Sequence, residues 1–391
     1  MRIAAGAGVV AALIVARSVS ANPPTQPLTN RAYEIDLYEG FALGTSALVA
    51  MGGAGVANAI GAAGMLINPS APAVRQTTDS DSWSWDYLLD YLYGSQSGDY
   101  DNAQLGSQSS GANVLTLGLA GRYHDWSAAI TGTGQYEDLD THVRPEELHL
   151  RFAVARWIPE LDLAVGADVS IGQFDLVDTE PSPNETLFTL SGAGIEVGAQ
   201  WLPRMQDLRL GATAATSEHG HNVSVSGCDP DLCDGFILPE EVYVPWRLAG
   251  GIAYRWAETR WNQIVRTPFR DEHAVTFAAD LVVTGAAPNG YGLQAAFESP
   301  QLLERSGRHV VWSPRAGVEY EWLPGRLRVR AGSYWEPGRF EGVDGRLHGT
   351  FGIELRAFQF DLWGLRRGRI TLTADNAPNY HNGGVSIGFW H

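Results

Sequence analysis

The chain has 391 residues, of which 44 are Asp or Glu and 27 are Lys or Arg, so its formal net charge is −17. This acidic balance argues against nucleic acid as a partner, because phosphates favour a basic surface. The length allows one large β-barrel or two to three ordinary domains.

The N-terminus has the pattern of an export signal. Arg2 supplies a positive charge, residues 3–16 are apolar or small, and Val19-Ser20-Ala21 offers small residues at the cleavage position. We therefore expect a signal peptide over residues 1–21, cleaved after Ala21.

A long uncharged stretch follows at residues 41–67. It contains six Gly, many Ala, and Asn58 near its centre, so its hydropathy is weak for a transmembrane helix. We interpret it as part of an N-terminal plug segment, residues 22–80, that fills space with small side chains. A lone membrane anchor or a flexible N-terminal arm is the alternative.

From about residue 82 onward, apolar residues alternate with polar or small ones. Residues 147–154, 161–171 and 274–283 show this period of two clearly. Successive side chains on a strand point to opposite faces, so each segment predicts a β-strand with one oily face. A secreted β-sandwich would show the same alternation, and the choice between it and a membrane barrel rests on the turns, the loops and the strand count.

A Trp and Pro turn recurs three times between alternating segments. Pro ends strand pairing because it has no N–H, and a Trp ring suits the headgroup level of a membrane. The pairs are Trp157 and Pro159, Trp201 and Pro203, and Trp322 and Pro324.

Long polar stretches join the other ends of these segments. Short turns at one end and long loops at the other are typical of outer-membrane barrels, as is an even strand number with both ends on the short-turn side. The stretch from Trp256 to Glu272 is longer than the other short-side turns. We predict an all-β, transmembrane antiparallel barrel over residues 81–391, with fourteen strands near 83–93, 112–121, 126–135, 147–156, 161–171, 187–200, 207–217, 246–256, 273–284, 310–321, 326–335, 347–357, 359–373 and 383–391.

Charged residues on the strands are expected to face the lumen, because exposure to lipid is costly. They would brace the wall through ion pairs more readily than bind a substrate. The candidates are Asp162, Asp168, Arg326, Arg328 and Arg330.

The two cysteines, Cys228 and Cys233, lie five positions apart in a predicted loop. In an exported chain this spacing favours a small loop disulfide. A zinc site would need more ligands of this kind. The sequence predicts no metal site and no cofactor.

Three further sequence patterns are weak indications of a catalytic or metal-binding site. Gly384-Val385-Ser386-Ile387-Gly388 matches a nucleophile elbow, but it lies in the last strand, with no helix to follow. Asp229, Asp231 and Asp234 lack the spacing of a calcium loop. His219 and His221 have no evident third ligand. We therefore do not predict an enzyme; a barrel lipase is a distant alternative.

The Gly/Ala-rich run that includes Gly52, Gly53, Ala54 and Gly55 leads into Asn68-Pro69-Ser70. This order resembles the N-terminal hatch of the FadL-type long-chain fatty-acid transporters, where a Gly-Gly-Ala run precedes Asn-Pro-Ala. Residues 244–254 and 315–337 are also similar to stretches of that family. The chain ends in Phe389-Trp390-His391 instead of a terminal aromatic, and it is somewhat short. Both departures bear on the substrate more than on the fold.

The resemblance implies a bacterial outer-membrane channel for the uptake of hydrophobic small molecules such as long-chain fatty acids. The ligand would pass from extracellular loops through the lumen, past a hatch formed by Gly52, Gly53, Ala54, Gly55, Asn68 and Pro69. The implied partners are outer-membrane lipid, lipopolysaccharide and the hydrophobic ligand. The alternative is a FadL-like barrel that does not transport and instead assists secretion or surface assembly.

Overall fold

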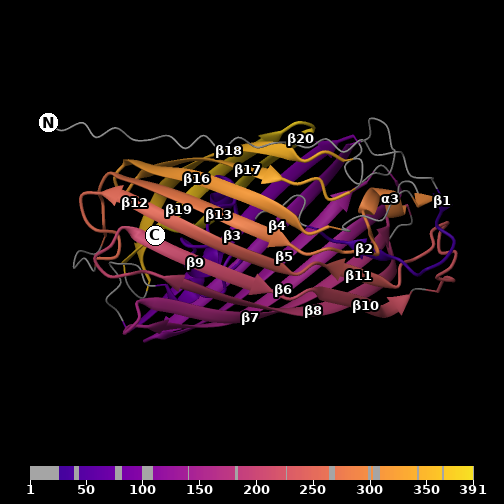
Figure 1. Ribbon diagram of the computed structural model, residues 1–391, viewed down its shortest axis with the longest axis horizontal. Helices are drawn as coiled ribbons and strands as arrows, with labels where there is room; N and C mark the ends of the chain where they lie inside the picture. Colours follow the sequence, from indigo (N-terminus) through magenta and orange to yellow (C-terminus); the bar gives the residue numbers. More distant parts are fainter. Residues whose placement is uncertain are drawn as a thin grey trace.

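Fourteen antiparallel strands close into one barrel in the computed structural model (Figure 1). The structure describes residues 26–38, 44–74, 82–98, 109–139, 141–180, 184–225, 227–263, 269–297, 301–302, 309–340, 343–362 and 365–390. The expected signal peptide, 1–21, lies outside these residues. The barrel strands are β3 Trp83–Ser97, β4 Ser109–Tyr123, β5 Trp126–Asp138, β6 Val143–Ile158, β7 Leu163–Asp178, β8 Glu185–Trp201, β9 Leu208–Ala215, β12 Arg247–Ala257, β13 Ala274–Thr284, β16 Val311–Leu323, β17 Leu327–Glu336, β18 Arg346–Asp361, β19 Leu365–Ala377 and β20 Tyr380–Phe389.

The ring is complete because the last strand pairs with the first. β20 lies antiparallel to β3, with Gly388 opposite Leu88, and β9 pairs directly with β12. A closed ring has no free edge, so the strand backbones bond to each other, as a hydrocarbon environment requires. The predicted all-β barrel of fourteen strands is confirmed.

The outer face of the barrel is apolar. Leu115, Leu117 and Leu119 on β4 are each about half exposed, whereas Thr116 between them is buried toward the lumen. Phe351 and Leu355 on β18 alternate in the same way with buried polar residues. The period of two in the sequence therefore separates an oily outside from a polar inside.

A charge placed on this outer face should impair folding into lipid. We expect Leu117→Arg to cost about 2–4 kcal/mol, the range for a cation near the bilayer centre. The folded fraction in vesicles, measured by heat-modifiable migration on gels, should fall. Leu232→Arg, at an exposed position in the disulfide loop, should leave it unchanged. Equal folding of both variants would contradict a lipid-facing belt.

The last hairpins differ from the sequence prediction. β18 continues to Asp361, and β19 begins at Leu365 instead of residue 359. A β-bulge between Arg356 and Phe358 shifts the alternation, so the end of β18 resembles the start of a new strand. β20 begins three residues early, at Tyr380, because Asn379 adopts a positive φ of 58° in a tight turn.

The loop end of the barrel, opposite the short turns, carries a cap of small elements. The disulfide Cys228–Cys233 lies within it, with a Cα–Cα distance of 5.2 Å. Strand β2 of the N-terminal segment lies parallel to β11 and β14. The cap elements are β1 Gln26–Pro27, β2 Glu34–Asp36, β10 Glu218–Val225, β11 Glu241–Val244, β14 Gly290–Tyr291, α3 Leu293–Phe297 and β15 Gln301–Leu302.

The remaining helices lie in the N-terminal segment and are one turn long: α1 Ser46–Val49, α2 Gly61–Gly64 and the 3₁₀ turn η1 Ala71–Ala73. Among the described residues, no helix is long and apolar enough to cross a bilayer.

Candidate functional site in the barrel lumen

Residues 44–74 lie inside the barrel (Figure 1). α1 contacts β18, β19 and β20, α2 contacts β3, β4 and β5, and η1 contacts β4 to β7. The six residues that the sequence assigns to a hatch, Gly52 to Gly55 with Asn68 and Pro69, are all buried. The segment therefore occupies part of the lumen.

Three aspartates of the barrel wall hold the backbone of this segment. Asp280 accepts hydrogen bonds from the N–H groups of Gly55 and Val56, at 2.6 and 2.9 Å. Asp90 accepts from the Ser46 N–H at 2.9 Å and from its hydroxyl at 3.0 Å. Irregular backbone must find partners for buried N–H groups, and these wall carboxylates supply them.

Asp86 on β3 contributes a similar bond, since it accepts from the Ala62 N–H at 2.8 Å. Thr350 on β18 accepts from the Gly52 N–H at 3.0 Å. β19 and β20 lie between β18 and β3 in the ring, and β13, which carries Asp280, lies three strands beyond β18, so the segment is held by several strands and not along one.

The Asn-Pro motif forms a second attachment. The Asn68 side-chain amide donates to the Val56 carbonyl at 2.9 Å and to the Ala199 carbonyl of β8 at 3.2 Å. Its oxygen accepts from the Ser70 N–H and hydroxyl, at 3.1 and 2.7 Å. Asn68 thus connects two parts of the segment to each other and to the wall, and its amide both donates and accepts in doing so.

Glycines in the wall allow the segment to approach closely. A side chain at Gly317 or Gly332 would overlap the backbone at Met51, and one at Gly211 would overlap Val56. Gly317 and Gly332 face each other across β16 and β17. Because these positions have no side chain, the backbone of the segment can contact the backbone of the barrel wall directly.

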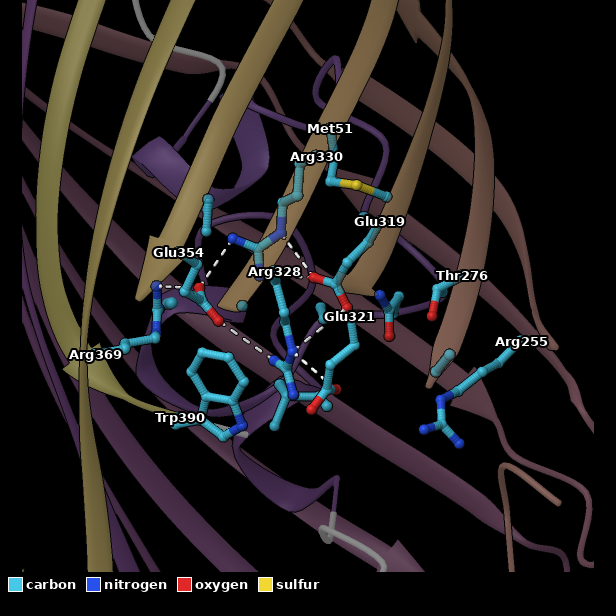
Figure 2. A pocket seen from close by; sticks show the side chains of 18 of the residues that line it. Met51, Arg255, Thr276, Glu319, Glu321, Arg328, Arg330, Glu354, Arg369 and Trp390 are labelled. Atoms are coloured by element: carbon cyan, nitrogen blue, oxygen red, sulfur yellow. Dashed lines mark hydrogen bonds and ion pairs between the residues drawn. The ribbon is translucent and has the colours of Figure 1, made fainter. Parts of the chain in front are cut away.

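A charged network braces the short-turn half of the lumen (Figure 2). Glu354 is 1% exposed and receives Arg330 at 2.8 Å, Arg369 at 2.9 Å and Arg328 at 3.3 Å. Buried charges persist when they are paired and hydrogen-bonded. The members of this Glu354 network are Glu319, Glu321, Arg328, Arg330, Glu354 and Arg369.

The long turn between β12 and β13 folds back into the mouth of the barrel. Asp271 pairs with Arg367 of β19, with one contact at 2.8 Å, and the hydrogen bonds from Arg367 lower the pKa of the Asp271 carboxyl. Glu272 accepts from Arg255 at 2.9 Å. Burial raises the pKa of Glu272, but bonds from Thr259 and Arg255 outweigh it, and the pKa lies below its ordinary value. These contacts hold Asp271 and Glu272, at the end of the long turn, against β19 and β12.

A cavity of about 210 Å³ lies between the luminal segment, the Glu354 network and the long turn. Its lining joins apolar residues of the segment, such as Leu48 and Met51, to arginines of the wall. Two smaller cavities of about 60 and 20 Å³ border β8, β10 and Leu37, closer to the cap.

The cap encloses an apolar cluster at the loop end. Ile35 and Phe297 are almost fully buried in it, together with Phe188 and Leu190 of β8. Arg339 anchors the N-terminal segment here, since its guanidinium contacts Asp36 at 2.7 Å with both side chains buried. An apolar interior thus lies on the loop side of the luminal segment.

The predicted lumen charges fall into two groups. Arg328, Arg330 and Asp168 face the lumen. Asp162 and Arg326 do not, because each lies in a short turn just before its strand begins. Asp162 accepts from the Arg204 backbone at 2.9 Å, outside the lumen.

The three Trp-Pro turns differ in which face of the barrel their Trp ring lies on. Trp201 and Trp322 lie on the outer face, 42% and 56% exposed, and Pro159, Pro203 and Pro324 lie in the turns between strands. Trp157 departs from the prediction of an interfacial ring. It continues the inward alternation of Ala153 and Ala155 and packs, half-buried, on a luminal cluster of Ala73, Val74, Ala155, Ala164 and Leu202.

Comparison with known sequences finds neither a family model nor a curated protein that matches. Among solved structures, the chain is similar to a FadL homologue of Pseudomonas aeruginosa, with 12% identity, a TM-score of 0.57 and coverage of 90% of this chain and 99% of that one. It is also similar to the CymD monoaromatic hydrocarbon channel, with 14% identity, a TM-score of 0.53 and coverage of 90% of this chain and 97% of that one. For the Pseudomonas putida toluene transporter TodX the identity is 14%, the TM-score is 0.51, and the coverage is 92% of this chain and 99% of that one. The resemblance to the FadL type is confirmed at the level of the fold.

Proposed function

We propose that this chain is a bacterial outer-membrane channel through which small hydrophobic molecules pass, and that residues 44–74 act as its movable hatch. The observation that carries the proposal is the luminal segment itself. It lies in the lumen of a barrel with an apolar outer belt, and hydrogen bonds and close backbone contacts with the wall hold it there.

The distribution of polarity supports a hydrophobic cargo. The cap interior is apolar, and Leu48 and Met51 of the segment contribute apolar surface to the otherwise largely charged lining of the cavity at the other end. A water-filled pore for polar solutes would present a polar channel along its whole length. Among the similar structures, CymD and TodX carry monoaromatic hydrocarbon and toluene by their names. Fatty acids remain a second cargo class within the same proposal.

Uptake by vesicles tests the proposal. Outer-membrane vesicles containing the protein should accumulate radiolabelled toluene or oleate several-fold faster than vesicles that lack it. A vesicle preparation with the Leu232→Arg protein serves as a matched control, because that residue is exposed in the disulfide loop, and it should behave as the wild type. If neither compound enters faster, the channel proposal is wrong, and the non-transporting secretion partner replaces it.

A further inference from the structure

The luminal cavity at the short-turn end has an uneven charge distribution. Seven arginines and four acidic residues line it, although the whole chain carries a net charge of −17. The cavity wall is therefore a basic region, by three charges, within an acidic protein.

One side of this cavity is balanced. The Glu354 network contains three arginines and three glutamates, and Arg367 is paired with Asp271 of the long turn. The charges of these groups balance, although the Arg367 Nε has no hydrogen-bond partner among the described residues. The surplus must lie on the other side.

The surplus consists of Arg209 on β9, Arg255 on β12 and Arg270 in the long turn, all lining the cavity. One carboxylate, Glu272, serves two of them, accepting from Arg255 at 2.9 Å and from Arg270 at 2.7 Å. Arg255 stands apart from the Glu354 network in Figure 2, with no interaction drawn between them.

Of these three arginines, Arg209 is the one that Glu272 does not pair with. It is 2% exposed, its Nε donates to the Asn262 amide oxygen at 2.9 Å, and its guanidinium lies 3.9 Å over the Trp261 ring. Its Nη1 has no hydrogen-bond partner among the described residues. A buried guanidinium without an anion is strongly unfavourable, so pairing with an anionic ligand would stabilise Arg209.

We propose that this cavity binds the carboxylate of a small amphipathic acid, with the Arg209 guanidinium as its cationic partner and the apolar part packed against the luminal segment. The roof suits that part, because Leu48, Met51, Ala54 and Ile60 line it. The volume of about 210 Å³ is below the roughly 300 Å³ at which ordinary ligand pockets begin. It therefore admits an acid of medium chain length or an aromatic acid better than a long chain.

The inference rests on the proposed channel and narrows its cargo. A neutral hydrocarbon in this cavity would give the Arg209 guanidinium no ion-pair partner, whereas a carboxylate would form an ion pair with it. The site lies on the short-turn side of the luminal segment, so on the proposed route from the loop end an acid bound there would have passed the segment.

The test compares octanoate with octan-1-ol, which has the same chain length and no charge. Isothermal titration with purified full-length protein in a non-ionic detergent should show octanoate binding at least tenfold more tightly. Arg209→Gln should weaken octanoate binding about 10- to 100-fold, the range for losing a hydrogen bond to a charged group, and should leave octan-1-ol unchanged. Arg209→Lys should retain part of the preference for octanoate.

Arg204→Gln is the matched control, since Arg204 is exposed in a turn and pairs with Asp162 outside the lumen. Heat-modifiable migration establishes that each variant is folded. If Arg209→Gln does not fold, Arg255→Gln and the wild-type comparison of acid with alcohol decide the question. Equal wild-type affinity for both compounds overturns the proposal.

Two further outcomes separate the possibilities. Tight binding of inorganic phosphate without octanoate binding would show a site for free anions and overturn the amphiphile assignment. Toluene uptake by vesicles should be the same for wild type and the control Arg204→Gln. If wild-type vesicles take up no toluene while octanoate still binds through Arg209, the channel function fails and the anion site stands.

Discussion

Replacing Gly317 and Gly332 with Val should open the lumen. Both glycines face inward on adjacent strands, and a side chain at either position would overlap the backbone at Met51. Overpacking of this kind costs about 1–3 kcal/mol for each added side chain. The double variant should therefore lower the ratio of molecules with the segment in place to molecules with the segment displaced at least tenfold. A free-energy change of about 1.4 kcal/mol corresponds to a factor of ten.

Single-channel conductance in planar bilayers measures this opening. The wild type should show low, infrequent current, and the double variant a raised and sustained current. Val suits a strand in its own right, so the barrel itself should remain folded.

The matched control is Gly250→Val with Gly349→Val, because nothing lies within 4 Å of a side chain built at either position and both are exposed on barrel strands. Its conductance should equal that of the wild type. A folded Gly317→Val and Gly332→Val protein with unaltered conductance would show that the segment does not close the channel.

The barrel could be predicted because its physical signal is local. A strand that separates lipid from lumen must alternate, and this alternation is visible over short windows such as residues 161–171. Strand number followed from counting these windows. The errors arose at the ends, where Asp162 and Arg326 continue the pattern by one step but already belong to turns. One-residue errors of this kind place a charge on the wrong side of the strand end.

The attachment of the luminal segment could not be predicted in the same way. Asp280 and Gly55 are 225 positions apart in sequence, so no local pattern connects them. A weaker signal was present, since Asp86, Asp90 and Asp280 are acids on strands that otherwise contact lipid on one face, and such acids are expected to have a role. The sequence does not identify what they bind.

Arg209, whose Nη1 has no hydrogen-bond partner in the described part of the chain, shows a related limit. Its partners Asn262 and Trp261 come from the long turn, which appears in the sequence only as an interval too long for a hairpin. The excess of positive charge around the cavity arises from strands β9 and β12 and from this turn. It is visible only when they are brought together.

Removing the carboxylates that hold the segment should loosen it without adding bulk. In Asp280→Ala, the Gly55 and Val56 N–H groups lose their acceptor, and an unsatisfied buried donor costs about 1–3 kcal/mol. Asp90→Ala removes the corresponding acceptor for Ser46. We expect each substitution to raise the exposure of the segment roughly 10- to 100-fold, and the two together to act additively, because the sites share no partner.

Exposure is measurable through a single introduced thiol, since both natural cysteines are in the disulfide. Ala54→Cys, at a position 2% exposed in the segment, should react slowly with a membrane-impermeant maleimide in the wild-type background and faster with Asp280→Ala. Asp280→Asn keeps one acceptor oxygen and should lie between them. Asp162→Asn, in a turn outside the lumen, should have no effect. Equal labelling rates in all four proteins would mean that the wall carboxylates do not hold the segment in place, and the hatch would need another means of closure.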